Sequence, residues 1–149
     1  MVSLVHEVGG EKMNICVDTE RIFAYRGRRK DNGEWVYGGY YWIELGKGRK
    51  HYIFSSGASN VYDIEIESGT ADRWTGREDK NDNEVFENDI LAVGSSRVLS
   101  LVFWDRENSR FSLKNLIRNE IYPFDSRFDK EDIEVVGDAH DNPELLEVG

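Results

Sequence analysis

The stretch KDNGEWVYGGYYWIEL, residues 30–45, contains the clearest structural signal in the chain. Asn32 and Gly33 form the dipeptide that tolerates the positive φ angles of a tight β-turn, so we predict a hairpin joining Arg21–Arg29 to Trp35–Leu45. Along the second arm, apolar side chains occupy both alternating positions of an extended strand. The hairpin predicts a fold built on antiparallel strands.

The two faces of this arm predict an association surface. One face carries Trp35, Tyr37 and Tyr41, and the other carries Tyr40 and Trp42. A small protein can bury one apolar face in its core, so the second has to be covered by another part of the chain, a second subunit or a ligand. We expect core packing combined with self-association, with these five aromatic residues as the candidate oligomer or partner surface.

Short strands separated by polar turns continue outward from the hairpin, and a sustained helical period is rare. A second hairpin turn is predicted at Asp105–Arg110, which returns through Phe111 and Leu113. The further strands that we predict are Tyr52–Ser55, Val61–Ile66, Glu84–Val93, Val98–Trp104 and Ile133–Val136.

Helix is predicted at only two places. Asn115–Tyr122 is ambiguous between loop and one or two helical turns. At the end of the chain, DNPELLE predicts a short helix because Asn142 can cap it and Pro143 suits its first position. We therefore predict a mainly β protein, with a hairpin-rich part at residues 1–74 and a small β-barrel at residues 75–149 that this helix closes.

The acidic stretch DKNDNEVFENDIL, Asp79–Leu91, raises the question of a calcium site. A calcium-binding loop needs glycine at its sixth position and a bidentate glutamate at its twelfth. Counted from Asp79, these positions hold Glu84 and Ile90. We therefore predict a solvent-facing turn followed by a strand, with no metal site.

No arrangement of residues indicates a catalytic centre. The three histidines, His6, His51 and His140, match no metal-ligand spacing and are expected at the surface or at sheet edges. Carboxylates in Asn-rich turns are solvated, which disfavours the raised pKa that paired-acid hydrolysis requires. The single Cys16 cannot form an internal disulfide or build a zinc site. We predict a noncatalytic protein without cofactor, and a hydrolase built from carboxylates is the third alternative, which a buried, close carboxylate pair in a cleft would support.

Charge divides the chain into two unlike halves. Residues 1–60 contain 9 Lys and Arg against 7 Asp and Glu, whereas residues 61–149 contain 10 against 22, so their net charges are +2 and -12. An acidic half repels phosphate backbones and favours basic protein partners, although acidic surface also serves solubility. The chain has no secretion signal and no apolar run near the roughly 18 residues of a membrane helix, so we expect a cytoplasmic location.

A nucleic-acid-binding module is the alternative function. The nine aromatic residues of the first 60 all lie between Phe23 and Phe54, beside a basic run. Aromatic rings can stack on bases while cations hold phosphates. The cations of this alternative surface are Arg26, Arg28, Arg29 and Lys30.

Three separated segments resemble the YopX family of phage and prophage proteins. They are FAYRGRRKDNGEWVYGGY at Phe23–Tyr40, TADRWTGREDKNDNEVFENDIL at Thr70–Leu91 and IEVVGDAHDNPELLE at Ile133–Glu147. Their order and spacing match across about residues 20 to 147. The chain departs from the family at Arg73, Arg77 and Asn83, and residues 1–20 resemble an extension.

The resemblance implies a β-rich protein of a phage or prophage in a bacterial host, with a small barrel similar to Src homology 3 domains in its second half. It also implies multimers, but it brings no activity, cofactor or catalytic residue. We expect a noncatalytic accessory protein that self-associates and binds a host or phage protein through its acidic half.

Overall fold

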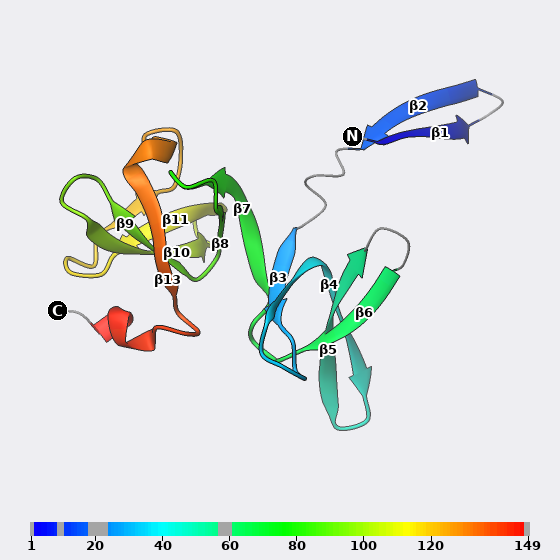
Figure 1. Cartoon of the computed structure of the whole chain (residues 1–149), viewed down its shortest axis with the longest axis horizontal. Helices are drawn as coiled ribbons and strands as arrows, with labels where there is room; N and C mark the ends of the chain where they lie inside the picture. Colours follow the sequence, from blue (N-terminus) through cyan, green and yellow to red (C-terminus); the bar gives the residue numbers. More distant parts are fainter. Residues whose placement is uncertain (1, 9–10, 18–23, 57–60, 148–149) are drawn as a thin grey trace.

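Antiparallel strands and two 3-10 helices form the structure, a computed structural model that describes residues 2–8, 11–17, 24–56 and 61–147 (Figure 1). A two-stranded sheet pairs β1 (Val2–Val8) with β2 (Glu11–Val17). A six-stranded sheet has the order β6-β5-β4-β3-β7-β8, and a five-stranded sheet has the order β12-β11-β10-β9-β13. The predicted mainly β class is confirmed. In the described residues, no helix is long and apolar enough to cross a membrane.

The six-stranded sheet is formed by β3 (Tyr25–Arg28), β4 (Trp35–Leu45), β5 (Gly48–Ser56), β6 (Val61–Ile66), β7 (Asp72–Glu78) and β8 (Glu84–Phe86). The five-stranded sheet is formed by β9 (Asp89–Val93), β10 (Val98–Asp105), β11 (Arg110–Asn115), β12 (Ile121–Pro123) and β13 (Ile133–Asp138). The 3-10 helices are η2 (Lys130–Asp132) and η3 (Pro143–Glu147).

Both predicted hairpins are present. β3 and β4 pair around a turn in which Gly33 has a φ of 75°, the conformation that the Asn-Gly dipeptide favours. β10 and β11 pair as far as Asp105 and Arg110, where the second turn was expected. The Asn-Gly turn and the polar turn thus act as local signals that tertiary packing does not override.

The two helix predictions have different outcomes. The closing helix is present, but η3 is a 3-10 helix of 5 residues rather than an α-helix. Asn115–Tyr122 contains a turn and the start of β12 rather than helix. There the Asn115 side chain accepts hydrogen bonds from the backbone N–H groups of Ile117 and Arg118, which closes a turn instead of a helix.

The six-stranded sheet curls so strongly that its edge strand β6 returns to β3. Arg29 and Ile66 form a bridge, and Lys30 N–H donates to the Glu65 carbonyl at 3.0 Å. Glycine on the inner face allows this approach, since a Cβ at Gly27 of β3 would lie 2.6 Å from Ile66 Cδ1 of β6. Gly38 allows the same close packing between β4 and β5, where a Cβ would lie 2.0 Å from the Phe54 carbonyl oxygen. Ile53 and Ile66 fill the inside of the curl and are 0% and 2% exposed.

The five-stranded sheet has the main hydrophobic core on one side. The buried members of the core are Val85, Leu91, Val102, Leu113, Phe124 and Ile133. Each of these side chains stabilises the fold by about 1.5 to 3 kcal/mol when it is removed from water.

The predicted closed barrel is wrong for the described residues. β12 and β13 are the two edges of the five-stranded sheet and do not pair with each other. β12 has only 3 residues and ends at Pro123, which has no N–H group to extend a ladder. The other edge is covered by the turn after β7, because Val135 N–H donates to the Asp79 carboxylate and Lys80 N–H donates to the Ile133 carbonyl.

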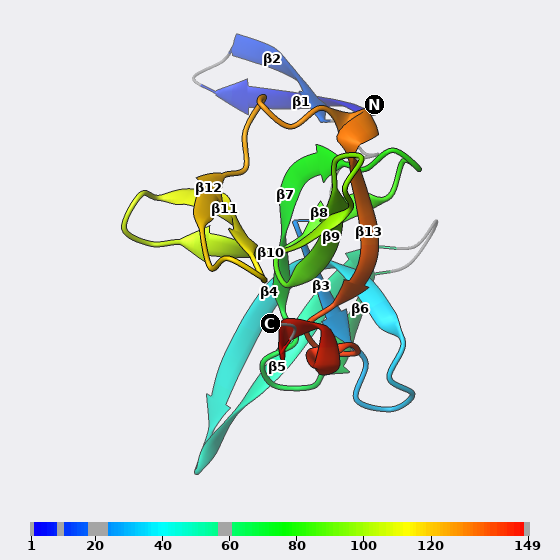
Figure 2. The same ribbon diagram turned by 90° about the vertical axis from the view of Figure 1, so that its left-hand side faces the viewer.

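The two parts of the chain meet at β7. This strand pairs with β3 on one side and β8 on the other, and it spans the predicted boundary between residues 74 and 75. Figures 1 and 2 show β3, β4, β5 and β6 on one side of β7 and the five-stranded sheet on the other, with the β4–β5 hairpin extending away from the five-stranded sheet. The division into residues 1–74 and 75–149 stays a prediction.

Candidate functional site

A buried arginine connects the two sheets. Arg26, on β3, is only 6% exposed. Its Nε donates to Asp72 Oδ2 at 3.1 Å, and its Nη2 lies 2.7 Å from Asp89 Oδ1. The guanidinium also lies over the rings of Trp35 and Phe86, with its Cζ 4.3 and 4.9 Å from their centroids. Because Asp72 begins β7 and Asp89 begins β9, one side chain ties the six-stranded sheet to the five-stranded sheet.

The C-terminal segment joins the same cluster. His140 Nε2 lies 3.0 Å from Asp72 Oδ2, and its ring meets Trp35 edge-on at 5.8 Å. The next residue, Asp141, forms an ion pair with Arg28. His140 is therefore half-buried in the interior junction, and the expectation that it is a surface or edge residue is wrong.

Two of the cluster's carboxylates are withdrawn from water, contrary to the expectation that Asp and Glu are solvated here. Asp72 and Asp89 are each 1% exposed. Burial raises the pKa of Asp89 to about 6, although Arg26 opposes this shift. Burial raises the pKa of Asp72 as well, against the hydrogen bond from Asn88 and the charge of Arg26. The cluster is thus an ion pair held in a poorly solvated position.

The cluster's contacts describe a structural tie. Asp72 binds Arg26, His140 and the side-chain amide of Asn88, whose Nδ2 donates to Oδ1 at 2.7 Å. The Phe86 backbone N–H donates to Asp89 Oδ2 at 2.8 Å, and Arg26 faces the other oxygen. Asp72 is held by hydrogen bonds, whereas Asp89 Oδ1 is buried and has only its ion pair with Arg26. Proton transfer to a substrate would have to disturb these contacts.

The acidic stretch Asp79–Leu91 begins with the predicted turn, but the single strand predicted at Glu84–Val93 is divided by a second turn into β8 and β9, which belong to different sheets. Asp79 was expected to face solvent, but its side chain is buried, with 0% exposed. Its Oδ1 accepts hydrogen bonds from the backbone N–H groups of Asn81 and Asn83, both at 2.9 Å. This carboxylate closes the turn and covers the β13 edge. Among the residues that the structure describes, no three His, Cys, Asp or Glu side chains are grouped to hold a metal ion.

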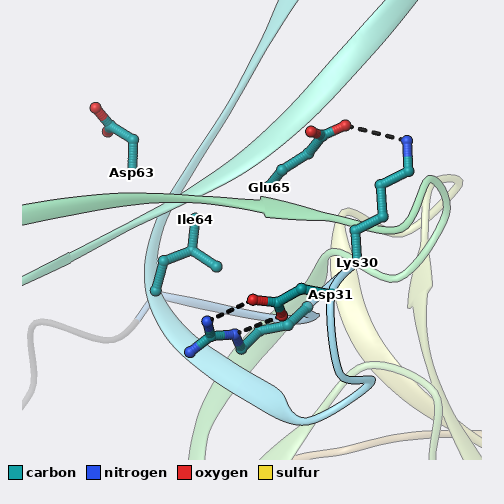
Figure 3. A pocket seen from close by; sticks show the side chains of 6 residues that line it. Lys30, Asp31, Asp63, Ile64 and Glu65 are labelled. Atoms are coloured by element: carbon teal, nitrogen blue, oxygen red, sulfur yellow. Dashed lines mark hydrogen bonds and ion pairs between the residues drawn. The ribbon is translucent and has the colours of Figure 1, made fainter.

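The predicted basic surface is matched by acidic partners. Arg26 is buried, and Arg28 pairs with Asp141. The other two cations line a cavity of about 410 Å³. Figure 3 shows Lys30 reaching Glu65 there. The ion pairs here are Arg29 with Asp31 at 2.8 Å and Lys30 with Glu65 at 3.1 Å. Pairing lowers the positive potential that a phosphate backbone needs, so the geometry disfavours the nucleic-acid alternative.

The five predicted aromatic residues are divided between the interior and the surface. Trp35 packs against Arg26, Arg28 and His140, and Tyr40 lies on the inner face, where its hydroxyl is 2.6 Å from His51 Nδ1. The other three, Tyr37, Tyr41 and Trp42, are half-buried or exposed.

The outer face of β4 and β5 combines Tyr41, which was predicted as a surface residue, with apolar residues outside the predicted set. Tyr41 stacks on Tyr52 of β5 with ring centroids 5.2 Å apart. On the same face, Ile43 and Phe54 are 38% and 48% exposed. We call Tyr41, Ile43, Tyr52 and Phe54 the outer aromatic face.

A second cavity, of about 380 Å³, opens beside the buried cluster. Arg26 and Asp89 contribute to its lining, and Tyr37, Glu84 and Phe86 contribute from neighbouring strands. The cavity therefore lies at the junction of the two sheets, a position where ligand sites often occur.

Sequence reasoning missed Asp72, Asp89 and His140 because the histidine was tested only for metal-ligand spacing and the carboxylates were expected to be solvated. A signal existed in the three segments that carry the YopX resemblance. The first contains Arg26, the second contains Asp72 and Asp89, and the third contains His140. Segments far apart in the chain thus meet in one buried cluster.

The chain is similar to a known protein family. The family described as YopX protein matches residues 24–147, which include the buried cluster, both large sheets and the outer aromatic face. No curated protein matches the chain at a significant level.

Proposed function

Because the chain belongs to the YopX family, we propose that it is a noncatalytic phage or prophage accessory protein. It self-associates through the outer aromatic face and binds a basic host or phage protein through its acidic surface. The observation that carries this proposal is the exposed apolar side of β4 and β5.

The outer aromatic face has the character of an interface. Phe54 and Ile43 expose 48% and 38% of their surface, and the paired rings of Tyr41 and Tyr52 lie between them on adjacent strands. Adjacent exposed apolar residues of this kind lose water favourably when a second protein surface covers them. The β4–β5 hairpin extends from the body of the protein, so a second copy can approach it (Figures 1 and 2).

The acidic half supports binding of a basic partner. Residues 61–149 carry 22 acidic residues against 10 Lys and Arg. Ion pairs within the chain use some of these carboxylates, as where Arg97 and Lys80 both bond to Glu134. The excess of negative charge attracts a cationic surface and accelerates encounter at low salt.

Light scattering after size-exclusion chromatography tests the self-association. We expect the wild-type protein to form a dimer or a larger assembly and Ile43→Lys to shift it toward monomer. Ile117→Lys is the matched control, since Ile117 is 60% exposed but lies on the turn before β12. A monomeric wild-type protein, or equal effects of the two substitutions, would contradict the proposal.

Retention of partners from a bacterial lysate tests the acidic surface. We expect basic proteins to bind at low salt and to elute as the salt concentration rises. Retention of acidic proteins alone, or of none, would count against this part of the proposal.

A further inference from the structure

The cavity at the junction of the two sheets is a built recess with distinct sides. Arg26 and Asp89 contribute their buried ion pair, while Tyr37 and Phe86 contribute rings whose centroids are 5.7 Å apart. Asp82 and Glu84 line it from the turn before β8 and from β8 itself. Its volume of about 380 Å³ is within the range of about 300 to 1,000 Å³ found for ligand pockets.

Negative charge exceeds positive charge around this recess. Of its lining residues, three are carboxylates and one is Arg26, whose charge is already shared by Asp72 and Asp89. Lys130 adds a cation from outside the lining, but it bonds to both Asp82 and Glu78. A cationic group gains attraction here, and an anionic group is repelled.

The aromatic rings make the recess selective for a particular kind of cation. Tyr37 is 38% exposed, so part of its surface is accessible to a bound group. An aromatic ring attracts a guanidinium or an ammonium and also packs against the methylene stem that carries it. Arg26 already uses this mode, since its Cζ lies 4.9 Å from the centroid of Phe86.

We propose that this recess receives an arginine or lysine side chain of a basic protein partner, with the charged group beside Glu84 and the methylene stem against Tyr37. The inference rests on the proposed function and names the contact by which the acidic surface recognises its partner. The buried Arg26–Asp89 ion pair forms a rigid side of the recess because it is held from both sheets.

An NMR titration of the full chain tests the inference with a ten-residue peptide of alternating arginine and glycine. The comparison peptide replaces each arginine with citrulline, which has nearly the same shape but no charge. We expect the arginine peptide to shift the amide signals of Tyr37, Glu84, Phe86 and Val135, and the citrulline peptide to leave them unchanged.

Two variants and a charge-matched control locate the binding. Glu84→Gln should weaken the arginine peptide about threefold to fivefold, the upper range for a partly exposed ion pair. Tyr37→Ala should weaken it to a similar extent through lost cation–π contact. Glu107→Gln, which removes the same charge from the β10–β11 turn, should leave the affinity unchanged.

The outcomes separate this inference from the proposed function. Equal weakening by Glu84→Gln and Glu107→Gln, or amide shifts confined to other surfaces, would overturn the recess as the contact while leaving an acidic binding surface intact. Equal binding of the citrulline peptide would overturn the role of charge. If the wild-type protein does not bind the arginine peptide even at low salt, both proposals are contradicted.

Discussion

The junction between the sheets buries charged side chains, whereas the outer face of β4–β5 exposes apolar ones. Both regions are the reverse of the usual distribution in globular proteins. At the junction, charged side chains are almost completely buried, with Asp72 and Asp89 each 1% exposed. On the outer face, Phe54 is 48% exposed. Buried charges are stable only when they are paired, and exposed apolar groups are common singly but not in clusters. The difference teaches that this fold keeps charged groups away from water by pairing them, while it leaves a cluster of apolar side chains accessible on β4 and β5.

The largest expected effect follows from removing the central cation of the junction. Arg26→Met keeps a similar stem against Trp35 and Phe86 but leaves two buried carboxylates without their ion pair. We expect a loss of about 3 to 5 kcal/mol in the free energy of unfolding, measured by urea denaturation. Arg29→Met is the control because Arg29 pairs at the surface with Asp31, and it should have no measurable effect. Similar stabilities of the two variants would show that the junction is not held by its charges.

Adjacent glycines sharpen the contrast between the two faces of the six-stranded sheet. Gly38→Ala places a Cβ 2.0 Å from the Phe54 carbonyl oxygen, and the backbone has to move, so we expect a loss of about 3 kcal/mol. Gly39→Ala meets nothing within 4 Å on the other face and should be neutral or slightly stabilising. Thermal unfolding of both variants measures the difference. Equal melting temperatures would show that the curl does not depend on the inner glycine.

The pH dependence of stability tests the buried charge at Asp89. Its folded pKa of about 6 lies above its ordinary value, so the folded protein holds this proton more tightly than the unfolded chain does. The stabilisation that comes from this raised pKa is fully present below about pH 4 and is lost as the pH rises through 6. Relative to Asp89→Asn, the wild-type protein should therefore lose about 2 to 3 kcal/mol between pH 4 and pH 7. Urea denaturation across this range measures the two free energies of unfolding. A constant difference between the two proteins would count against a buried Asp89 with a raised pKa.

The contact between His140 and Asp72 predicts a smaller effect, at the end of the chain. His140→Ala removes one hydrogen bond and the edge contact with Trp35, so we expect a loss of about 1 kcal/mol. Compared with the wild-type protein, hydrogen exchange should become faster in Glu144–Glu147 and stay unchanged in the core strand β10. Unchanged exchange in the C-terminal residues would show that Arg28 and Asp141 hold the segment without the histidine.

The smallest expected change in stability is on the outer aromatic face. Phe54→Ser should alter the free energy of unfolding of the monomer by no more than about 0.5 kcal/mol, because the side chain is half exposed. The same substitution should weaken self-association in light scattering. A large loss of monomer stability would mean that this face serves the fold after all.

Local signals predicted much of the fold and little of the site. Gly33 and the turn at Asp105–Arg110 act through conformations of a few residues, so both hairpins were predictable. The closed barrel was not formed because edge pairing depends on strand lengths across the whole sheet. The site required Arg26, Asp72 and His140 to meet, and no local pattern encodes contacts across 46 and 68 residues.

The sequence by itself determined the class of fold, the two hairpins, the family and the charge imbalance, because alternation, turn chemistry and net charge are properties of nearby residues or of sums over them. Only the tertiary structure decided which carboxylates leave water, which aromatic residues stay exposed and which cations are paired. Those outcomes depend on distances between segments far apart in the chain. The free energy of a charge or of an apolar ring is set by the neighbours that the fold brings to it.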